Sequence, residues 1–232
     1  MSETVSISTL EGDGTFSAYC ARPEGDPRAA IVVIQEIFGV NPGIRGKCDR
    51  LAEDGYLALA PDLFWRLQPG VELDPDIEAE FEQALELMGR FDQDRGVADI
   101  EAAIRFARAD LGIVKVGAVG YCLGGRLAYM VAARTDADAS VGYYAVGIPD
   151  LLREKHAIAN PLLLHIAGAD HFVPPEQQKG IHEGLDDHPR VTLHDYPGED
   201  HGFAAEMGRR RSEEAARLAD SRTMAFFAAH LG

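Results

Sequence analysis

The sequence predicts an α/β fold: a mostly parallel central sheet with helices on both faces and an N-terminal hairpin. Short runs of Val, Ile, Leu and Ala alternate along the 232 residues with segments of helical spacing, as in proteins whose parallel strands are joined by helices. Several of these runs contain no alternating polar residues, which is typical of strands buried on both faces. A glycine-rich turn between the first two strand-like segments indicates a hairpin.

The predicted elements follow from this pattern in chain order. The first half should contain hairpin strands at 4–9 and 15–23 around a turn at 10–14, a buried strand within 29–39, a helix at 44–55, a strand at 56–63 and two helices within 75–109. The second half should contain strands at 115–120, 139–145, 161–166 and 190–196, with helical patterns between several of them and a last helix over about 211–230. Since no repeat or Pro/Ser-rich linker interrupts the pattern, we expect one domain spanning 1–232.

The charge balance is strongly acidic, with 22 basic and 38 acidic residues and a net charge of -16. Such a surface repels nucleic acid and anionic lipid, because binding to either needs Lys or Arg to neutralise phosphates. The sequence shows no secretory signal pattern and no apolar run approaching the ~18 residues of a membrane span. We therefore expect neither nucleic-acid nor membrane partners.

The cysteines are three in number and widely spaced, at Cys20, Cys48 and Cys122. An odd, scattered set argues against a disulfide framework and for a reducing, cytoplasmic location. No C-x-x-C or H-E-x-x-H motif is present, so we expect no metal ion, and no cofactor motif stands out. The sequence does not indicate an oligomeric state.

A glycine-flanked cysteine follows the strand predicted at 115–120. Hydrolases of the α/β class place a nucleophilic serine in G-x-S-x-G at such a strand-to-helix corner, and this chain has Gly-Tyr-Cys-Leu-Gly at 120–124. The backbone of such a corner is strained, and glycines two residues to either side remove side chains that would clash. Cys122 is therefore a candidate nucleophile, although a lone cysteine is more often an inert buried hydrophobe.

Two further residues lie just past separate predicted strands. Asp170 follows the strand at 161–166 and His201 follows the strand at 190–196, so that Cys122, Asp170 and His201 occur in the nucleophile–acid–histidine order of α/β-hydrolases. In a parallel sheet such loops meet at the carboxyl ends of the strands. An Asp or His on a loop is usually solvated surface, but three such residues in this order favour a catalytic triad.

Five segments together resemble the dienelactone hydrolase family over essentially the whole chain: QEIFGVN, APDLFWR, GYCLGG, GADHFVP and HGFA. The resemblance implies an α/β-hydrolase fold and a triad of Cys122, His201 and Asp170. It also implies that Glu36 is hydrogen-bonded to the resting thiol and helps to form the thiolate when substrate binds. The oxyanion would be held by the backbone N–H groups of Leu123, after the nucleophile, and of Ile37.

The chemistry expected of these groups is ester or lactone hydrolysis through a thioester. A free thiol is mostly protonated at neutral pH, and His201 oriented by Asp170 can take its proton. A carboxylate beside the sulfur would oppose thiolate formation, so Glu36 could act as a switch; alternatively it caps a loop or pairs with an arginine. The competing hypothesis is a non-catalytic α/β module that binds a small molecule, and acyl transfer to an acceptor other than water also stays open.

The substrate pocket departs from the family pattern. Members acting on dienelactone carry two arginines that hold the substrate carboxylate, and the aligned positions here are Phe81 and Ala205. Neutral or apolar acyl groups are therefore expected to be preferred, unless Arg66 or one of the arginines at 209–211 substitutes. The residues expected to line the pocket are Phe38, Trp65, Phe81, Leu85, Met88, Tyr144 and Phe203. For Phe38, Trp65, Tyr144 and Phe203 a place in the core is an equal alternative.

Overall fold

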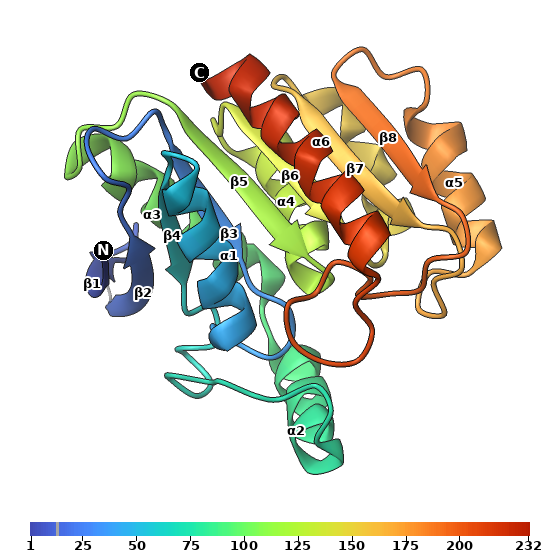
Figure 1. The fold of residues 1–232 in the computed structure, drawn as a ribbon, viewed down its shortest axis with the longest axis horizontal. Helices are drawn as coiled ribbons and strands as arrows, with labels where there is room; N and C mark the ends of the chain where they lie inside the picture. Colours follow the sequence, from blue (N-terminus) through green and yellow to red (C-terminus); the bar gives the residue numbers. More distant parts are fainter. Residues whose placement is uncertain (13) are drawn as a thin grey trace.

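The computed structural model describes residues 1–12 and 14–232 and has an α/β architecture (Figure 1). Among these residues, eight strands form one sheet in the order β1-β2-β4-β3-β5-β6-β7-β8. The strands are β1 Ser2–Ser8, β2 Thr15–Ala21, β3 Ala30–Ile34, β4 Leu57–Pro61, β5 Val116–Tyr121, β6 Ala139–Tyr143, β7 Leu162–Ala167 and β8 Val191–Tyr196. Pairing is antiparallel from β1 to β2 and from β2 to β4, and parallel throughout the rest. The mostly parallel sheet and the N-terminal hairpin are confirmed, while residue 13 of the expected turn lies outside the described residues.

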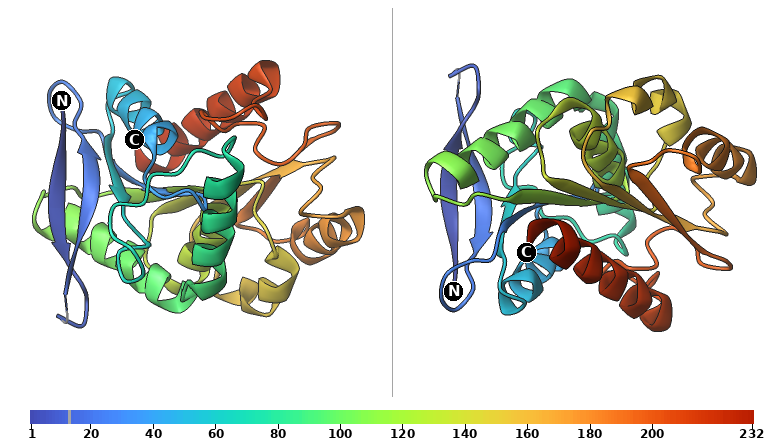
Figure 2. Two further views of the ribbon diagram at one scale, coloured as in Figure 1. Left: turned by 90° about the horizontal axis from the view of Figure 1, so that it is seen from below. Right: turned by 90° about the horizontal axis from the view of Figure 1, so that it is seen from above.

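Helices cover both faces of the sheet (Figure 2). They are α1 Pro42–Glu53, α2 Glu78–Arg90, α3 Gln93–Ala109, α4 Leu123–Arg134, the 3₁₀ helix η1 Ile148–Ala157, α5 Pro175–Leu185 and α6 Glu213–Leu231. Apolar side chains of α1 and α6 pack in one core cluster, and those of α3, α4, η1 and α5 in another on the opposite face. The central strands are therefore buried on both sides, as their unbroken apolar sequences predicted.

Local sequence signals set the helix starts. The side chain of Asn41 accepts a hydrogen bond from the N–H of Ile44 at 3.1 Å, and Pro42 opens α1 at a position where no N–H is needed. Asp92 caps α3 by accepting from the N–H groups of Asp94 and Arg95. These caps satisfy N–H groups that have no partner within the helix.

Several predicted strands are shorter in the structure, and two of them end beside the candidate site. The strand expected at 139–145 ends at Tyr143, because Tyr144 adopts a left-handed backbone with φ of 36°. The strand expected within 29–39 covers only Ala30–Ile34, after which the chain leaves the sheet at its carboxyl edge. Both ends deliver residues to the loops where the candidate site lies.

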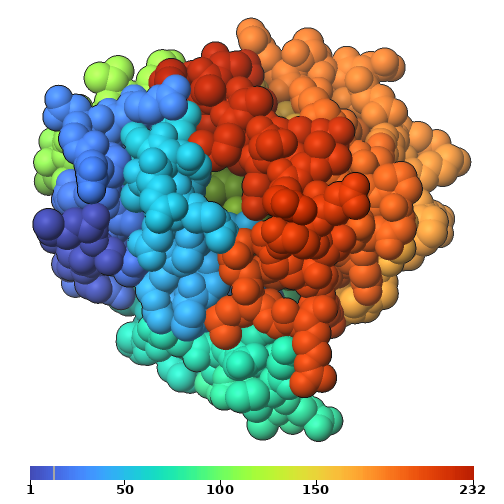
Figure 3. All heavy atoms as spheres, in the orientation of Figure 1, coloured from blue at the N-terminus to red at the C-terminus, as the bar shows by residue number. Residues whose placement is uncertain are grey.

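The helix α2 lies beyond the carboxyl ends of the parallel strands, at the bottom of Figure 1 and of the space-filling view in Figure 3. Its buried residues Ala84 and Leu87 join the core cluster of α3 and α4, while Leu85 and Met88 are 40% and 37% exposed. No helix in the described part of the chain is long and apolar enough to cross a membrane.

Candidate active site

Cys122 occupies a tight corner between β5 and α4. Its backbone is left-handed, with φ of 58°, and its N–H donates to the carbonyl of Tyr143 at 3.0 Å. A Cβ on Gly120 would lie 1.9 Å from the carbonyl oxygen of Gly124, and a Cβ on Gly124 would lie 2.4 Å from that of Ile34. Only glycine fits at both positions, so the G-x-C-x-G pattern is a steric requirement of this corner.

His201 and Asp170 form a buried pair on the loops after β8 and β7. Nδ1 of His201 lies 2.8 Å from Oδ2 of Asp170, and both side chains are almost fully buried. The other Asp170 oxygen accepts hydrogen bonds from the N–H groups of Phe172 and Val173. Because the carboxylate accepts, we assign the proton to Nδ1, which leaves Nε2 to exchange protons with a reacting group.

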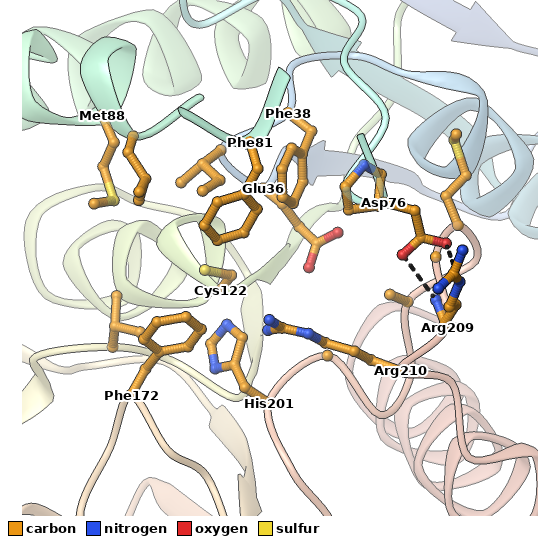
Figure 4. A pocket seen from close by; sticks show the side chains of 18 residues that line it. Glu36, Phe38, Asp76, Phe81, Met88, Cys122, Phe172, His201, Arg209 and Arg210 are labelled. Carbon is orange, nitrogen blue, oxygen red and sulfur yellow. Dashed lines mark hydrogen bonds and ion pairs between the residues drawn. The ribbon is translucent and has the colours of Figure 1, made fainter. Parts of the chain in front are cut away.

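The Nε2 atom of His201 is buried without a hydrogen-bond partner in the described part of the chain. The imidazole lies next to Cys122 at the base of the pocket in Figure 4. Burial lowers the pKa of His201, but negative charge on Cys122 and the hydrogen bond to Asp170 outweigh it and the net change is upward. A histidine in this position can therefore hold a proton taken from the thiol.

Asp200 fixes the backbone of His201 and was not anticipated from the sequence. Its Oδ1 accepts from the N–H of His201 at 2.6 Å and from Nδ1 of His171 at 2.7 Å. Partial burial raises the pKa of Asp200, but these hydrogen bonds overcome that effect and lower it to about 2. Its position directly before His201 is the only signal that could have pointed to it.

Glu36 is a half-buried carboxyl on the loop after β3, and in Figure 4 it points into the pocket. Burial raises the pKa of Glu36, and the positive charges of His201 and Lys47 oppose this without reversing it. Among the described residues no hydrogen bond joins Glu36 to Cys122. The hydroxyl of Tyr144 lies close to the Glu36 carboxyl, although it is buried and lacks a partner of full hydrogen-bond geometry in the chain as described.

The two backbone N–H groups expected to bind an oxyanion belong to Ile37 and Leu123. Leu123 is the first residue of α4, and the N–H groups of a first helical turn have no acceptor within the helix. The Ile37 N–H donates to no other group in the described residues, and Ile37 lines the same cavity as Cys122. Both donors are thus free to meet an oxyanion.

A cavity of about 250 Å³ opens over Cys122 and His201. Four of the side chains expected at the pocket line it, with Phe38 from the loop after β3 and Phe81, Leu85 and Met88 from α2. Phe172, two residues after Asp170, completes the apolar lining and packs edge-on against His201 at 4.9 Å between ring centroids. Phe172 was missed although it lies within the segment GADHFVP.

Three expected pocket residues lie outside this cavity. The indole N–H of Trp65 donates to Asp99 at 3.0 Å, and its ring stacks on Phe16. Phe203 is fully buried and packs against Tyr196, with 4.8 Å between ring centroids. Tyr144 lies behind Glu36 and His201, within the core cluster of the face covered by α1 and α6. Because these three rings pack against other residues, the expectation that Trp65, Tyr144 and Phe203 line the cavity is corrected.

Two of the arginines near the site line the cavity, and a cluster of acidic groups and a histidine lies beside it. Arg66 pairs with Asp99 outside the cavity, whereas Phe81, Ala205, Arg209 and Arg210 line it. One described cluster has the geometry to hold a metal ion: Asp170, His171 and Asp200. The hydrogen bonds given above already occupy its carboxylates.

A family model, curated relatives and a solved structure all relate this chain to the same group of proteins. Residues 16–231 match the model of the Dienelactone hydrolase family. A carboxymethylenebutenolidase of Pseudomonas putida is 42% identical over 229 residues, which is 98% of this chain and 97% of that protein. An Azospirillum brasilense protein provisionally given the same name is 47% identical over 222 residues, covering 95% and 96% of the two chains. A Klebsiella pneumoniae crystal structure, provisionally described as a dienelactone hydrolase, superposes with a TM-score of 0.84 at 28% identity and covers 98% and 99% of the chains.

Proposed function

This chain belongs to the dienelactone hydrolase family and is a hydrolase, and from that premise we propose that it cleaves a carboxylic ester or lactone. In this proposal Cys122 is the nucleophile, His201 is the base and Asp170 orients the histidine. One observation carries the proposal. Cys122 projects from a strained corner beside the free Nε2 of a histidine whose Nδ1 is held by a buried carboxylate at 2.8 Å. The alternative of a non-catalytic binding module is not favoured, because the chain matches a family of hydrolases and its relatives are named as carboxymethylenebutenolidases.

The first half-reaction forms a thioester. His201 Nε2 takes the thiol proton, and the Cys122 sulfur attacks the carbonyl carbon of the substrate. The oxyanion that develops accepts from the N–H groups of Ile37 and Leu123. When the tetrahedral intermediate collapses, the C–O bond to the leaving group breaks and the departing oxygen takes the proton from His201. In a lactone, cleavage of this C–O bond opens the ring.

The second half-reaction releases the acid. His201, again neutral, removes a proton from water as the water oxygen attacks the thioester carbonyl. Collapse of this intermediate expels the sulfur and regenerates the starting site. A thiolate leaves a tetrahedral intermediate more readily than an amine does, so esters and lactones should be cleaved in preference to amides.

Glu36 is proposed to regulate the thiol. Its carboxyl faces the same pocket as Cys122, and burial raises its pKa, so that it changes charge more easily than an exposed glutamate. An ionised Glu36 opposes negative charge on the sulfur, whereas a protonated or displaced one permits it. This keeps the resting thiol less reactive until substrate enters.

The test is the Cys122→Ala variant with the other two cysteines as controls. We expect loss of p-nitrophenyl acetate hydrolysis by about 10³-fold or more with unchanged folding. Cys20 and Cys48 are fully buried away from the cavity, so Cys20→Ala and Cys48→Ala should retain activity. Rapid quenching followed by mass spectrometry should show one acyl group on Cys122 of the parent. Hydrolysis by Cys122→Ala at a rate comparable with the parent would refute the assignment.

A further inference from the structure

A buried cation lies beside the candidate active site. Lys47 of α1 is 6% exposed, and no other lysine or arginine in the described part of the chain is buried to this extent. Its Nζ lies 3.0 Å from Oε1 of Glu206, on the loop before α6, and 3.3 Å from each carboxylate oxygen of Asp220, on α6. Because a buried ion pair contributes little net stability, the main effect of Glu206 and Asp220 is to fix where this positive charge lies.

Aromatic rings hold the same ammonium group next to the cysteine corner. Nζ of Lys47 lies 5.0 Å from the ring centroid of Tyr121 and 5.9 Å from that of Tyr143, distances at which a cation is attracted to a ring face. Tyr121 ends β5 and directly precedes Cys122. The charge is therefore held on the sheet face covered by α1 and α6, against the residue before the proposed nucleophile.

Lys47 and Glu36 meet at a small cavity outside the substrate pocket. This cavity has a volume of about 10 Å³, and its lining includes both residues together with Tyr144 and Glu206. Glu36 also lines the larger cavity over Cys122, whereas Lys47 does not. The lysine can therefore act on the Glu36 carboxyl without touching substrate.

The two other cations near Glu36 differ from Lys47 in where they lie. The imidazole of His201 and the guanidinium of Arg210 both act on the Glu36 carboxyl from within the substrate cavity. His201 gains and loses a proton in the proposed reaction, and both groups meet whatever enters the cavity. Lys47 takes no part in these proton transfers, so its charge is the constant part of the electrostatic field at Glu36.

Titratable groups face the lysine and the glutamate from several elements. Those around Lys47 are Arg50 and Asp54 of α1 and its end, Tyr121 of β5, Tyr143 of β6, Glu206 of the loop before α6 and Asp220 of α6. Those around Glu36 are Lys47, Cys122, Tyr144, His201 and Arg210. Within its own cluster of described residues Glu36 is thus the acidic group, with Lys47 as one of three cations around it.

We propose that Lys47 is a positioning residue whose buried ammonium group favours the ionised form of Glu36 in the resting enzyme and thereby keeps the Cys122 thiol less reactive until substrate enters. Burial raises the pKa of Glu36, and the charges of His201 and then Lys47 act against it, which agrees with this role. The inference rests on the proposed function, since Lys47 acts through the regulation of the thiol by Glu36. It gives α6 a part in that regulation, because Asp220 holds the ammonium group in place.

The experiment measures how fast iodoacetamide alkylates Cys122 as a function of pH, with mass spectrometry to identify the modified cysteine. Lys47→Gln removes the charge but keeps an N–H donor for the carboxylates, and Lys47→Met is a second neutral variant whose stem fills similar space. Lys47→Arg retains the charge. The control is Lys179→Gln, which changes the net charge by the same amount on α5, where the side chain is 74% exposed. Urea unfolding checks that each variant is folded.

Both neutral variants should alkylate about 3- to 10-fold faster than the parent at neutral pH, because Glu36 is then neutral more often. Lys47→Arg and Lys179→Gln should alkylate like the parent. The direction separates two explanations, since a lysine that acted directly on the sulfur would stabilise the thiolate, and its loss would slow alkylation. In the Glu36→Gln background, Lys47→Gln should bring no further acceleration.

Unchanged or slower alkylation in the folded neutral variants would overturn the role of Lys47, and so would an acceleration that persists in the Glu36→Gln background. Either result would leave the triad assignment intact, because that assignment depends on hydrolysis by Cys122→Ala. If Glu36→Gln itself alkylates like the parent, the proposed regulation by Glu36 fails, and the role of Lys47 fails with it.

Discussion

The ring of Tyr144 lies edge-on against the imidazole of His201, with 5.0 Å between the ring centroids and 64° between the planes. Tyr144 has a φ of 36°, a backbone conformation that costs energy in any residue with a Cβ. The side chain lies behind the pocket, where its hydroxyl is close to the Glu36 carboxyl. One residue therefore contacts the proposed base and lies close to the proposed regulator of the thiol.

Removing the Tyr144 hydroxyl should act through Glu36. Tyr144→Phe keeps the ring against His201 but deletes one of the groups that favour the ionised carboxylate, after His201 and Lys47, so Glu36 should be protonated more often. We expect faster alkylation of Cys122 by iodoacetamide at neutral pH, smaller in size than the effect of Glu36→Gln. The double variant should alkylate like Glu36→Gln alone. Additive effects of the two substitutions would show that the hydroxyl acts independently of Glu36.

Glu36→Gln should have opposite effects on the resting thiol and on turnover. A neutral amide removes the negative charge that opposes a thiolate, so alkylation should speed up, while loss of the switch should slow turnover by about 10-fold, below the usual range for a full general base. Identical alkylation–pH curves for variant and parent would leave Glu36 with a structural role.

Glu36→Gln should also change how the stability of the protein depends on pH. The folded-state pKa of Glu36 is raised above its unfolded value. Both states are protonated at low pH, and the parent loses stability as the pH rises from the unfolded towards the folded pKa. Glu36→Gln should therefore gain in melting temperature relative to the parent as pH rises from 4 to 7, and a difference independent of pH would contradict the upward shift.

Substitution of His201 should slow acylation more than substitution of Asp170. His201→Ala deletes the proposed base, whereas Asp170→Asn keeps a side chain that can hold the ring but presents an amide N–H to one of its three N–H partners. Single-turnover acylation should fall by about 10²–10⁴-fold in His201→Ala and by less in Asp170→Asn. His194→Gln, on β8 and away from the cavity, serves as the control. Unchanged acylation in His201→Ala would show that another group acts as the base.

The glycines of the corner should be indispensable to folding. A methyl group on Gly120 would have to displace the backbone of Gly124, so Gly120→Ala should cost more than about 3 kcal/mol of unfolding free energy. Gly46 lies inside α1 with open space around its Cβ position, so Gly46→Ala should instead stabilise by about 0.5–1 kcal/mol. Urea unfolding of both variants measures the contrast, and a mild effect at Gly120 would show that the corner can relax.

The fold and the corner were predictable because local rules determine them. Unbroken apolar runs form buried strands, and the glycines at 120 and 124 indicate the tight corner between β5 and α4, where a Cβ would clash with the backbone. Phe81, Leu85 and Met88 are spaced at four and three residues, so one face of α2 carries all three. Loops on neighbouring parallel strands end at one edge, which places Asp170 close to His201.

The pocket beyond α2 was less predictable because it depends on partners distant in sequence. Trp65 faces away from the cavity because Asp99 accepts its N–H, and nothing near position 65 reveals that contact. The run at 209–211 has no internal signal to say which arginine turns inward. Asp76 and Glu206 decide it by pairing with the two neighbours, while Arg210 acts on the Glu36 carboxyl.

The placement of α2 beyond the sheet edge has an evolutionary consequence. The groups proposed to break the bond follow strands of the central sheet, where a substitution disturbs the core, whereas Phe81, Leu85 and Met88 of the apolar cavity lining belong to one peripheral helix, on which Leu85 and Met88 are exposed. Mutations at the exposed positions of that helix can accumulate at little cost to folding, in contrast to those at its buried Ala84 and Leu87. Descendants of this chain can therefore acquire new substrates by drift in α2 while the inherited chemistry is preserved, and sequence divergence should be greatest there.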